Sequence, residues 1–274
     1  MDNRPIGVFD SGVGGLTVVR ELRRILPQEN IVYFGDTGRV PYGTRSRSTI
    51  TRYTQQDIAF LESRDVKMIV IACGTASSVI SKELGAKIKV PYTGVILPAA
   101  QAACSLTQKG VIGVIGTTAT IRSGAYGKSI RSINSACKVI GRDCPLFVPL
   151  VENGLIDPQN PITRLTAQMY LEPLMQEGID TLILGCTHYP LLYDLINDVI
   201  GYSAVLIDPG KETAHFVQNF LTTNNLLREE ESPAVCQYFV SDSADQFTAT
   251  ASKFLGADLG GNVQQIEIEA VQGA

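Results

Sequence analysis

Short apolar runs that alternate with longer helix-like stretches are the feature of this sequence that most restricts its fold. Residues 7–9, 31–34, 68–72, 111–115 and 182–184 have the composition of buried strands, and segments such as 16–26 and 213–224 have that of helices. This alternation predicts an α/β fold, with mostly parallel sheets flanked by helices. In such sheets the residues that follow the strands meet at one edge, where ligands bind. We therefore expect the following side chains at that edge: Asp10, Ser11, Asp36, Cys73, Thr117 and Cys186.

The two halves of the chain repeat one pattern. An apolar strand that ends in a small hydroxyl residue, Ser11 or Thr117, is followed 62 or 69 residues later by a strand that ends at a cysteine, Cys73 or Cys186. Such a repeat predicts two pseudo-symmetric α/β domains with the active site in the cleft between them. Prolines near 97–98 and 207–209 suggest where the chain crosses between them. The expected division is 1–97 plus 208–265, then 98–207, with 266–274 as a loosely held tail.

Composition excludes several other classes of protein. The 274 residues are 45% hydrophobic and 18% charged, which is unlike a disordered chain. The net charge of −4 argues against a nucleic-acid partner, because binding phosphates requires clustered cations. Neither a secretory signal nor an apolar run of 18 residues is present, so we expect a cytoplasmic protein with no membrane partner. Six cysteines without metal-binding spacing predict reduced thiols and no metal site.

Two of these cysteines have a sequence context that favours reactivity. Cys73 precedes small residues at the start of a predicted helix, a position that lowers the pKa of a thiol. Cys186 lies two residues before His188. Two opposed thiols suit a reaction that removes a proton from one face of a carbon atom and returns one to the other, without metal or cofactor. When a carbon atom next to a carboxylate loses its proton, an enediolate forms. Four residues with hydroxyl groups are available to stabilise it: Ser11, Thr75, Thr117 and Thr187.

Six motifs in order along the chain carry a resemblance to a known family. They are FDSGVGGLTV (9–18), YFGDT (33–37), VPYGT (40–44), IAC (71–73), VENG (151–154) and GCTHYP (185–190). Together they resemble the aspartate/glutamate racemase family, over residues 7 to about 221. The resemblance implies a cofactor-independent isomerase that interconverts L- and D-glutamate for peptidoglycan synthesis. It also implies two α/β domains with the site between them, and the family commonly forms homodimers.

The resemblance also implies roles for individual residues. Cys73 corresponds to the base that acts on D-glutamate and Cys186 to the base that acts on L-glutamate. Asp10 corresponds to the group that assists Cys73, and Glu152 and His188 to those that assist Cys186. The implied substrate contacts are Asp10, Ser11, Pro41, Tyr42, Gly43, Gly74, Thr75, Thr117, Thr120, Thr187 and His188. Asp36 also matches the family, but a role in forming the turn explains it equally well.

The sequence departs from the family at Gly74. The family has Cys-Asn-Thr where this chain has Cys73-Gly74-Thr75, so the amide that helps to hold the substrate is missing. Every implied catalytic side chain is retained, and we therefore expect an active glutamate-specific enzyme. Two alternatives remain. In the first, Gly74 enlarges the pocket for aspartate or another small dicarboxylate; in the second, it marks a weakened binding or regulatory homologue.

Overall fold

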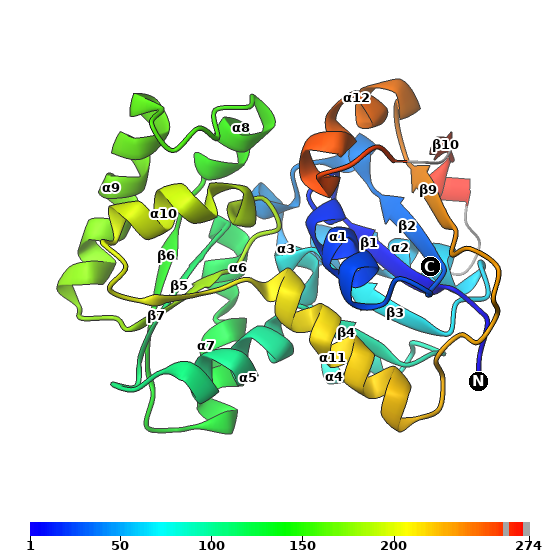
Figure 1. Ribbon diagram of the computed structural model, residues 1–274, viewed down its shortest axis with the longest axis horizontal. Coiled ribbons are helices and arrows are strands. Elements are labelled where there is room, and N and C mark those ends of the chain that lie inside the picture. Colours follow the sequence, from blue (N-terminus) through cyan, green and yellow to red (C-terminus); the bar gives the residue numbers. More distant parts are fainter. Residues whose placement is uncertain (260–262, 271–274) are drawn as a thin grey trace.

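The computed structural model of the protein describes residues 1–259 and 263–270. Two parallel β-sheets, one in each half of the molecule, form its framework (Figure 1). The first sheet has the strand order β10-β9-β2-β1-β3-β4 and the second has the order β6-β5-β7-β8. Every neighbouring pair is parallel. The predicted fold class, two α/β units with mostly parallel sheets, is confirmed.

The strands of the first sheet are β1 (Ile6–Asp10), β2 (Ile31–Gly35), β3 (Met68–Ile71), β4 (Tyr92–Gly94), β9 (Cys236–Val240) and β10 (Val263–Gln265). Those of the second sheet are β5 (Val111–Gly116), β6 (Lys138–Asp143), β7 (Thr181–Leu184) and β8 (Val205–Ile207). All five strands expected from apolar runs are present as β1, β2, β3, β5 and β7.

The longer helices are α1 (Leu16–Ile25), α2 (Arg47–Glu62), α5 (Ile96–Leu106), α7 (Ala125–Ile133), α9 (Pro161–Gln176), α10 (Tyr193–Val199), α11 (Pro209–Thr223) and α12 (Ala244–Leu255). Short α-helical turns are α3 (Gly74–Ser77), α4 (Lys82–Gly85), α6 (Thr118–Ser123) and α8 (Phe147–Glu152). The 3₁₀ turns are η1 (Thr37–Arg39), η2 (Tyr42–Thr44), η3 (Tyr189–Leu192) and η4 (Ile268–Ala270).

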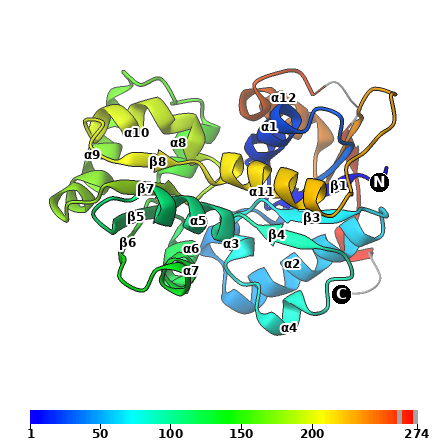
Figure 2. The same cartoon turned by 60° about the horizontal axis from the view of Figure 1, so that its bottom comes forward.

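Helices cover both faces of each sheet. In the first half, α1, α11 and α12 contribute to one hydrophobic cluster and α2 to another, on the opposite face of the sheet. In the second half, α9 and α10 belong to the first cluster, and α5 and α7 to a third. The first cluster includes buried residues of both halves, such as Val8 of β1 and Leu184 of β7. The two halves therefore share a continuous core, which fixes their strand ends near each other (Figures 1 and 2).

The chain passes between the sheets twice. It leaves the first sheet after β4 and returns to it with β9, after β8 has completed the second. The return begins at α11, where Asp208 accepts hydrogen bonds from the N–H groups of Gly210 and Lys211 and Pro209 occupies the first turn. Both intervals contain the prolines at which the crossings were predicted. The domain boundaries at 97–98 and 207–208 themselves stay a prediction.

The C-terminal segment differs in part from the predicted tail. Ile268 is buried in the first half, and η4 contacts α2, so residues 266–270 are not loosely held. Apolar contacts of Ile266 and Ile268 explain this, and the sequence analysis overlooked both side chains. Residues 271–274 lie outside the described part of the chain. Among the helices of the described residues, none combines the length and the apolar character needed to cross a lipid bilayer.

Candidate active site

A cavity of about 350 Å³ opens between the two halves, beyond the carboxyl ends of their strands. From the first half it is lined by Ser11, Gly12, Val40, Pro41, Tyr42, Gly43, Thr44, Cys73, Gly74 and Thr75. From the second half it is lined by Thr117, Thr118, Pro145, Val148, Pro149, Glu152, Gly185, Cys186, Thr187 and His188. Its size is within the range of small-molecule sites. Both halves must be in place to form it.

Cys73 lies at the N-terminus of α3, where β3 ends. The N–H of Ala76 donates to its Sγ at 3.4 Å, and the thiol donates to Ser11 Oγ at 3.6 Å. Burial and the neighbouring Asp10 carboxylate outweigh these contacts and raise the pKa of Cys73 to about 12. The predicted lowering of this pKa is therefore wrong for the free protein, because α3 is only four residues long and the thiol is buried. Cys73 is a thiol here, and so a proton donor.

Cys186 faces the same cavity from the end of β7, with an imidazole beside it. His188 Nδ1 lies 3.9 Å from Cys186 Sγ, and His188 Nε2 lies 3.0 Å from Glu152 Oε1. Burial alone lowers the pKa of His188, but its hydrogen bonds with Cys186 and Glu152 outweigh this and raise the pKa to about 10. Glu152 comes from α8, 36 residues away in sequence. The structure thus connects three predicted residues through side-chain contacts: Cys186 to His188, and His188 to Glu152.

Asp10 is buried behind the cavity and is not among its lining residues. Its Oδ2 accepts the N–H of Gly12 at 2.9 Å, and its Oδ1 lies 3.5 Å from Thr187 Oγ1. Burial raises the pKa of Asp10, although the nearby His188 opposes the rise. Asp10 is thus placed to act on Cys73 and Thr187 by charge and hydrogen bonding, whereas direct contact with a ligand would require movement.

Three threonine hydroxyls from the two halves meet at one side of the cavity. Thr75 Oγ1 and Thr120 Oγ1 each lie 2.9 Å from Thr117 Oγ1, and 3.3 Å separates them from each other. Thr117 also caps α6, by accepting the N–H of Thr120. Thr75 and Thr117 line the cavity, whereas Thr120 is buried behind them. Thr120 is therefore a support for the other two hydroxyls in this structure.

At Gly74 the backbones of the two halves lie very close together. A Cβ atom added at Gly74 would lie 2.5 Å from the carbonyl oxygen of Gly185, which is backbone of the other half. A second close approach occurs at Gly43, where a Cβ would lie 2.8 Å from Thr117 Cβ. The space that a side chain at position 74 would need is therefore taken up by the backbone of the other half. Gly74 allows the halves to pack more closely and leaves no extra room for a ligand at that point.

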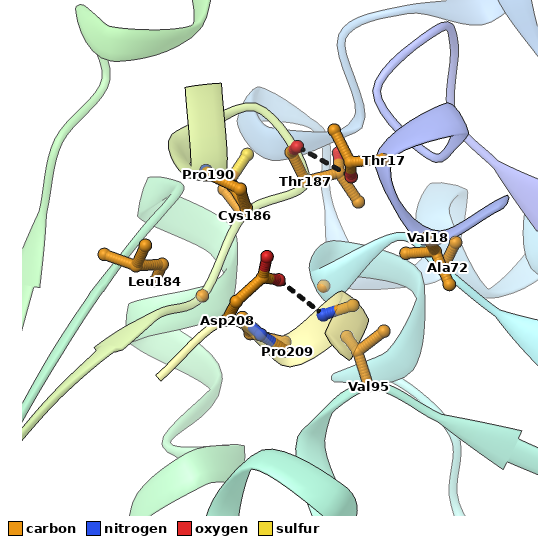
Figure 3. Close-up of a pocket in the computed structure, with 13 residues that line it drawn as sticks. Thr17, Val18, Ala72, Val95, Leu184, Cys186, Thr187, Pro190, Asp208 and Pro209 are labelled. Atoms are coloured by element: carbon orange, nitrogen blue, oxygen red, sulfur yellow. Dashed lines mark hydrogen bonds between the residues drawn. The ribbon is translucent and has the colours of Figure 1, made fainter. Parts of the chain in front are cut away.

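The side of the interface away from the cavity is also closely packed. Thr17 Oγ1 of α1 donates to the carbonyl oxygen of Thr187 at 3.0 Å, and Asp208 Oδ1 accepts the N–H of Gly210 at 2.8 Å (Figure 3). The space left between these contacts is about 10 Å³, which is no more than a single water needs. The Thr17–Thr187 contact holds the turn that carries Cys186 against the first half, and the Asp208 contact caps the neighbouring helix α11.

Asp36 lies outside the cavity, in a buried network beneath it. Arg39 Nε is 2.7 Å from Asp36 Oδ2, and Arg39 Nη2 is 3.0 Å from Asp57 Oδ1. The hydroxyl of Tyr42 hydrogen-bonds to both carboxyl groups, at 2.9 Å in the case of Asp57 Oδ2. Burial and the proximity of Asp36 raise the pKa of Asp57 well above its usual value. This network holds the segment that brings Pro41, Tyr42 and Gly43 to the cavity wall.

Comparison with known proteins decides the family. The family described as "Asp/Glu/Hydantoin racemase" matches residues 6–217. A glutamate racemase of Geobacter metallireducens is 48% identical over 267 residues, which are 97% of this chain and 98% of the relative. The chain belongs to the Asp/Glu/hydantoin racemase family. It is therefore a racemase, and the resemblance inferred from its motifs is confirmed.

Solved structures of racemases have the same architecture. A glutamate racemase of Francisella tularensis, in complex with D-glutamate, is 37% identical to this racemase and superposes with a TM-score of 0.91, covering 98% of this chain and 100% of that one. A glutamate racemase isoform of Bacillus anthracis is 38% identical, with a TM-score of 0.92 and coverage of 97% and 98%. An aspartate racemase homologue of Pyrococcus horikoshii, at 16% identity and a TM-score of 0.57 over 80% of this chain and 99% of that one, shares the fold alone.

The cavity of this racemase contains most of the residues predicted to form its site. Only Asp10 and Thr120 are set back from the wall. Sequence reasoning missed the apolar wall of the second half, which comprises Pro145, Val148 and Pro149. These residues lie just before Glu152 in the sequence, and this position could have indicated that they also line the cavity. The lining residues include no Lys or Arg, so any anion bound in the cavity relies on hydroxyl groups, backbone N–H groups and His188.

Proposed function

We propose that this racemase interconverts L- and D-glutamate by a two-base mechanism that uses Cys73 and Cys186. The observation that carries the proposal is that two thiols, one from each half, line a single cavity too small to serve a macromolecule. Sequence identity of 43–48% to proteins named glutamate racemase, over almost the whole chain, supports glutamate as the substrate.

In the direction from L- to D-glutamate, Cys186 as a thiolate removes the proton from Cα and becomes a thiol. The electron pair left on the substrate is delocalised into its carboxylate as an enediolate. The Cys73 thiol then delivers its proton to the opposite face of Cα and becomes a thiolate. In the reverse direction the two cysteines exchange roles. The balance requires no oxidant, reductant or cofactor.

The surroundings of each cysteine support these roles. The raised pKa of Cys73, about 12, keeps it protonated and ready to donate. His188, hydrogen-bonded to Glu152, exchanges a proton with Cys186 in this mechanism, and Asp10 acts on Cys73 through its charge. Hydroxyls of Ser11, Thr75, Thr117 and Thr187 are donors for the substrate carboxylates and for the enediolate.

A circular-dichroism assay with L-glutamate and the purified protein tests the proposal. The wild-type protein should abolish the optical activity. The Cys73→Ala variant should racemise glutamate at least about a thousandfold more slowly, because it lacks one of the two acid–base groups. Cys104→Ala is the matched control, since Cys104 lies outside the cavity and should leave the rate unchanged.

Two outcomes would sink the proposal. Substantial racemisation by Cys73→Ala would refute the two-base assignment, and faster turnover of aspartate than of glutamate in the same assay would refute the substrate.

We further propose that the enzyme supplies D-glutamate for peptidoglycan in the cytoplasm and partly self-associates to a homodimer. Sedimentation velocity at two protein concentrations tests the latter.

A further inference from the structure

The part of the cavity wall that η2 forms is anchored from behind through the side chain of Tyr42. Tyr42 lines the cavity, and its hydroxyl group lies in the buried network beneath. Three segments that are far apart in the sequence meet in this network: Asp36 follows β2, Asp57 comes from α2, and Ser241 follows β9. The position of Tyr42 therefore depends on groups that do not line the cavity themselves.

The contacts of the Tyr42 hydroxyl require one more hydrogen than the hydroxyl carries. Its oxygen contacts Asp36 Oδ2 and lies 2.9 Å from Asp57 Oδ2. A phenol has one hydrogen to donate, and an ionised carboxylate has none. If both carboxyl groups were ionised, one of the two contacts would press two oxygen atoms together in a buried site with no hydrogen between them. A proton on one carboxyl group removes this conflict.

The other contacts of the two carboxyl groups locate that proton on Asp57. Asp36 accepts from Arg39 Nε at 2.9 and 2.7 Å and from Ser241 Oγ at 2.8 Å, so it is surrounded by donors as an ionised carboxylate requires. Asp57 accepts from Arg39 Nη2 at its Oδ1, at 3.0 Å. The Oδ2 atom of Asp57 is the one that faces the Tyr42 hydroxyl, and it is free to carry a hydrogen.

The charges around Asp57 favour the same assignment. The groups that face it are Asp36 and Arg39 at the η1 turn, Tyr42 of η2 and Asp10 of β1. Burial and the charge of Asp36 raise the pKa of Asp57 well above its usual value; Asp10 adds to the rise, and Arg39 and Tyr42 oppose it. With Asp57 neutral, the positive charge of Arg39 balances the negative charge of Asp36. The buried network then has no net charge, which is the least costly arrangement away from water.

We propose that Asp57 is a positioning residue of this racemase: at neutral pH its protonated carboxyl group donates to the Tyr42 hydroxyl, which in turn donates to Asp36. This chain of hydrogen bonds fixes η2, whose Gly43 packs against Thr117 of the other half at the cavity wall. Asp57 does not line the cavity, so it acts through Tyr42. The protonation follows from the contacts alone, whereas its effect on substrate binding rests on the proposed function.

Infrared difference spectroscopy of the purified protein at neutral pH tests the protonation without any substrate. The spectrum of the wild type minus that of Asp57→Asn should contain the C=O stretching band of a protonated carboxylic acid. Labelling of aspartate with carbon-13 should displace the band. Absence of the band would overturn the protonation of Asp57, whatever the activity of the enzyme.

Kinetics with L-glutamate tests the positioning role. Asparagine and leucine both have nearly the shape of aspartic acid, but only asparagine keeps a donor for Tyr42. Asp57→Leu should raise KM at least about tenfold and change kcat less, because the buried Tyr42 hydroxyl loses a partner and η2 its anchor. Asp57→Asn should bind glutamate much as the wild type does. Arg52→Leu, on the exposed face of α2, is the control.

Equal KM values for Asp57→Leu and Asp57→Asn, whether raised or unchanged, would overturn the positioning role. If Asp57→Leu does not fold, Asp57→Asn still decides: a KM raised by about tenfold would show that the negative charge of Asp57, and not a donated hydrogen, holds η2. Racemisation by the wild type tests the proposed function separately, since the infrared band does not depend on it.

Discussion

At the scale of single residues, the imidazole of His188 is the group whose charge state the structure defines most clearly. Its pKa of about 10 is raised above the ordinary value, so His188 is protonated at neutral pH and loses its proton only as the pH approaches 10. The stability contributed by its contacts is accordingly present below the unfolded pKa, near 6.5, and is lost as pH rises through 10. Glu152 is one of the three groups that raise this pKa, with Cys186 and Asp10.

Removing the charge of Glu152 should change the pH dependence of catalysis. In Glu152→Gln the pKa of His188 falls, so the alkaline limb of kcat/KM should move to lower pH, with a rate loss of about tenfold at neutral pH. Both directions should change equally, because the equilibrium constant of a racemisation fixes their ratio. Glu177→Gln is the control, because Glu177 is exposed at the end of α9 and does not line the cavity. An alkaline limb that stays in place would show that Glu152 does not act through His188.

Gly74 is a second residue whose substitution gives a clear test. A Cβ atom there would meet backbone, so the halves must separate by a few tenths of an ångström or more before Ala or Asn fits. Gly74→Ala and Gly74→Asn should each lower kcat/KM by about tenfold, because small misplacements of reacting groups are costly. In Gly141→Ala, the control, the new Cβ would meet only side-chain carbons of Ile121. Higher activity of Gly74→Asn would mean that the missing amide, and not the close approach, is what matters.

At the scale of secondary-structure elements, five strands buried on both faces could be predicted. The edge strands could not, and neither could the interior strand β9, which begins with the partly exposed Cys236 and the exposed Gln237. The strands β1, β2, β3, β5 and β7 are continuous apolar runs because both of their faces are covered. The strand β6 carries Lys138, Arg142 and Asp143 and is only partly buried, and β4, β8 and β10 have three residues each. Their pairing depends on the neighbouring strand, so no local pattern marks them.

The same distinction explains how much of the site was predictable. Residues placed directly after buried strands, such as Ser11, Cys73, Thr117 and Cys186, follow from the strand pattern alone. Glu152 could be predicted only from the family resemblance, because the packing of α8 within the second half is what brings it to His188. Burial of the thiol, which reverses the predicted pKa shift of Cys73, is a property of the assembled core and no segment of sequence carries it.

The buried network beneath the η2 turn depends on one cation. Arg39 pairs with Asp36 and Asp57, both of which are completely buried. Arg39→Met should reduce the free energy of unfolding by about 3 kcal/mol at pH 8, because it leaves buried carboxylates without a partner. The loss should be smaller at pH 5 than at pH 8, because the raised pKa of Asp57 favours its neutral form as the pH is lowered.

Denaturant unfolding at the two pH values measures this effect, with Arg131→Met as the exposed control. A loss in Arg39→Met that is equal at pH 5 and pH 8 would mean that packing of the arginine side chain, rather than charge, holds the turn.

At the scale of the whole molecule, the active site exists only because two similar halves share one core. Each half supplies a cysteine at a strand end, and neither half alone encloses the cavity. In the proposed mechanism, this division of the two thiols allows a proton to leave one face of a carbon atom and another to arrive at the opposite face. The central claim of our account is therefore that different groups handle the two protons.

Isotope incorporation at early times tests that claim most directly. L-Glutamate is incubated with the wild-type protein in deuterium oxide, and the Cα hydrogen of each enantiomer is measured by mass spectrometry before equilibrium. Two bases predict that the D-glutamate formed carries deuterium, delivered by Cys73, while the remaining L-glutamate keeps its protium. D-Glutamate that retains the protium of the substrate would show that a single base moves one proton between faces, and would contradict the account.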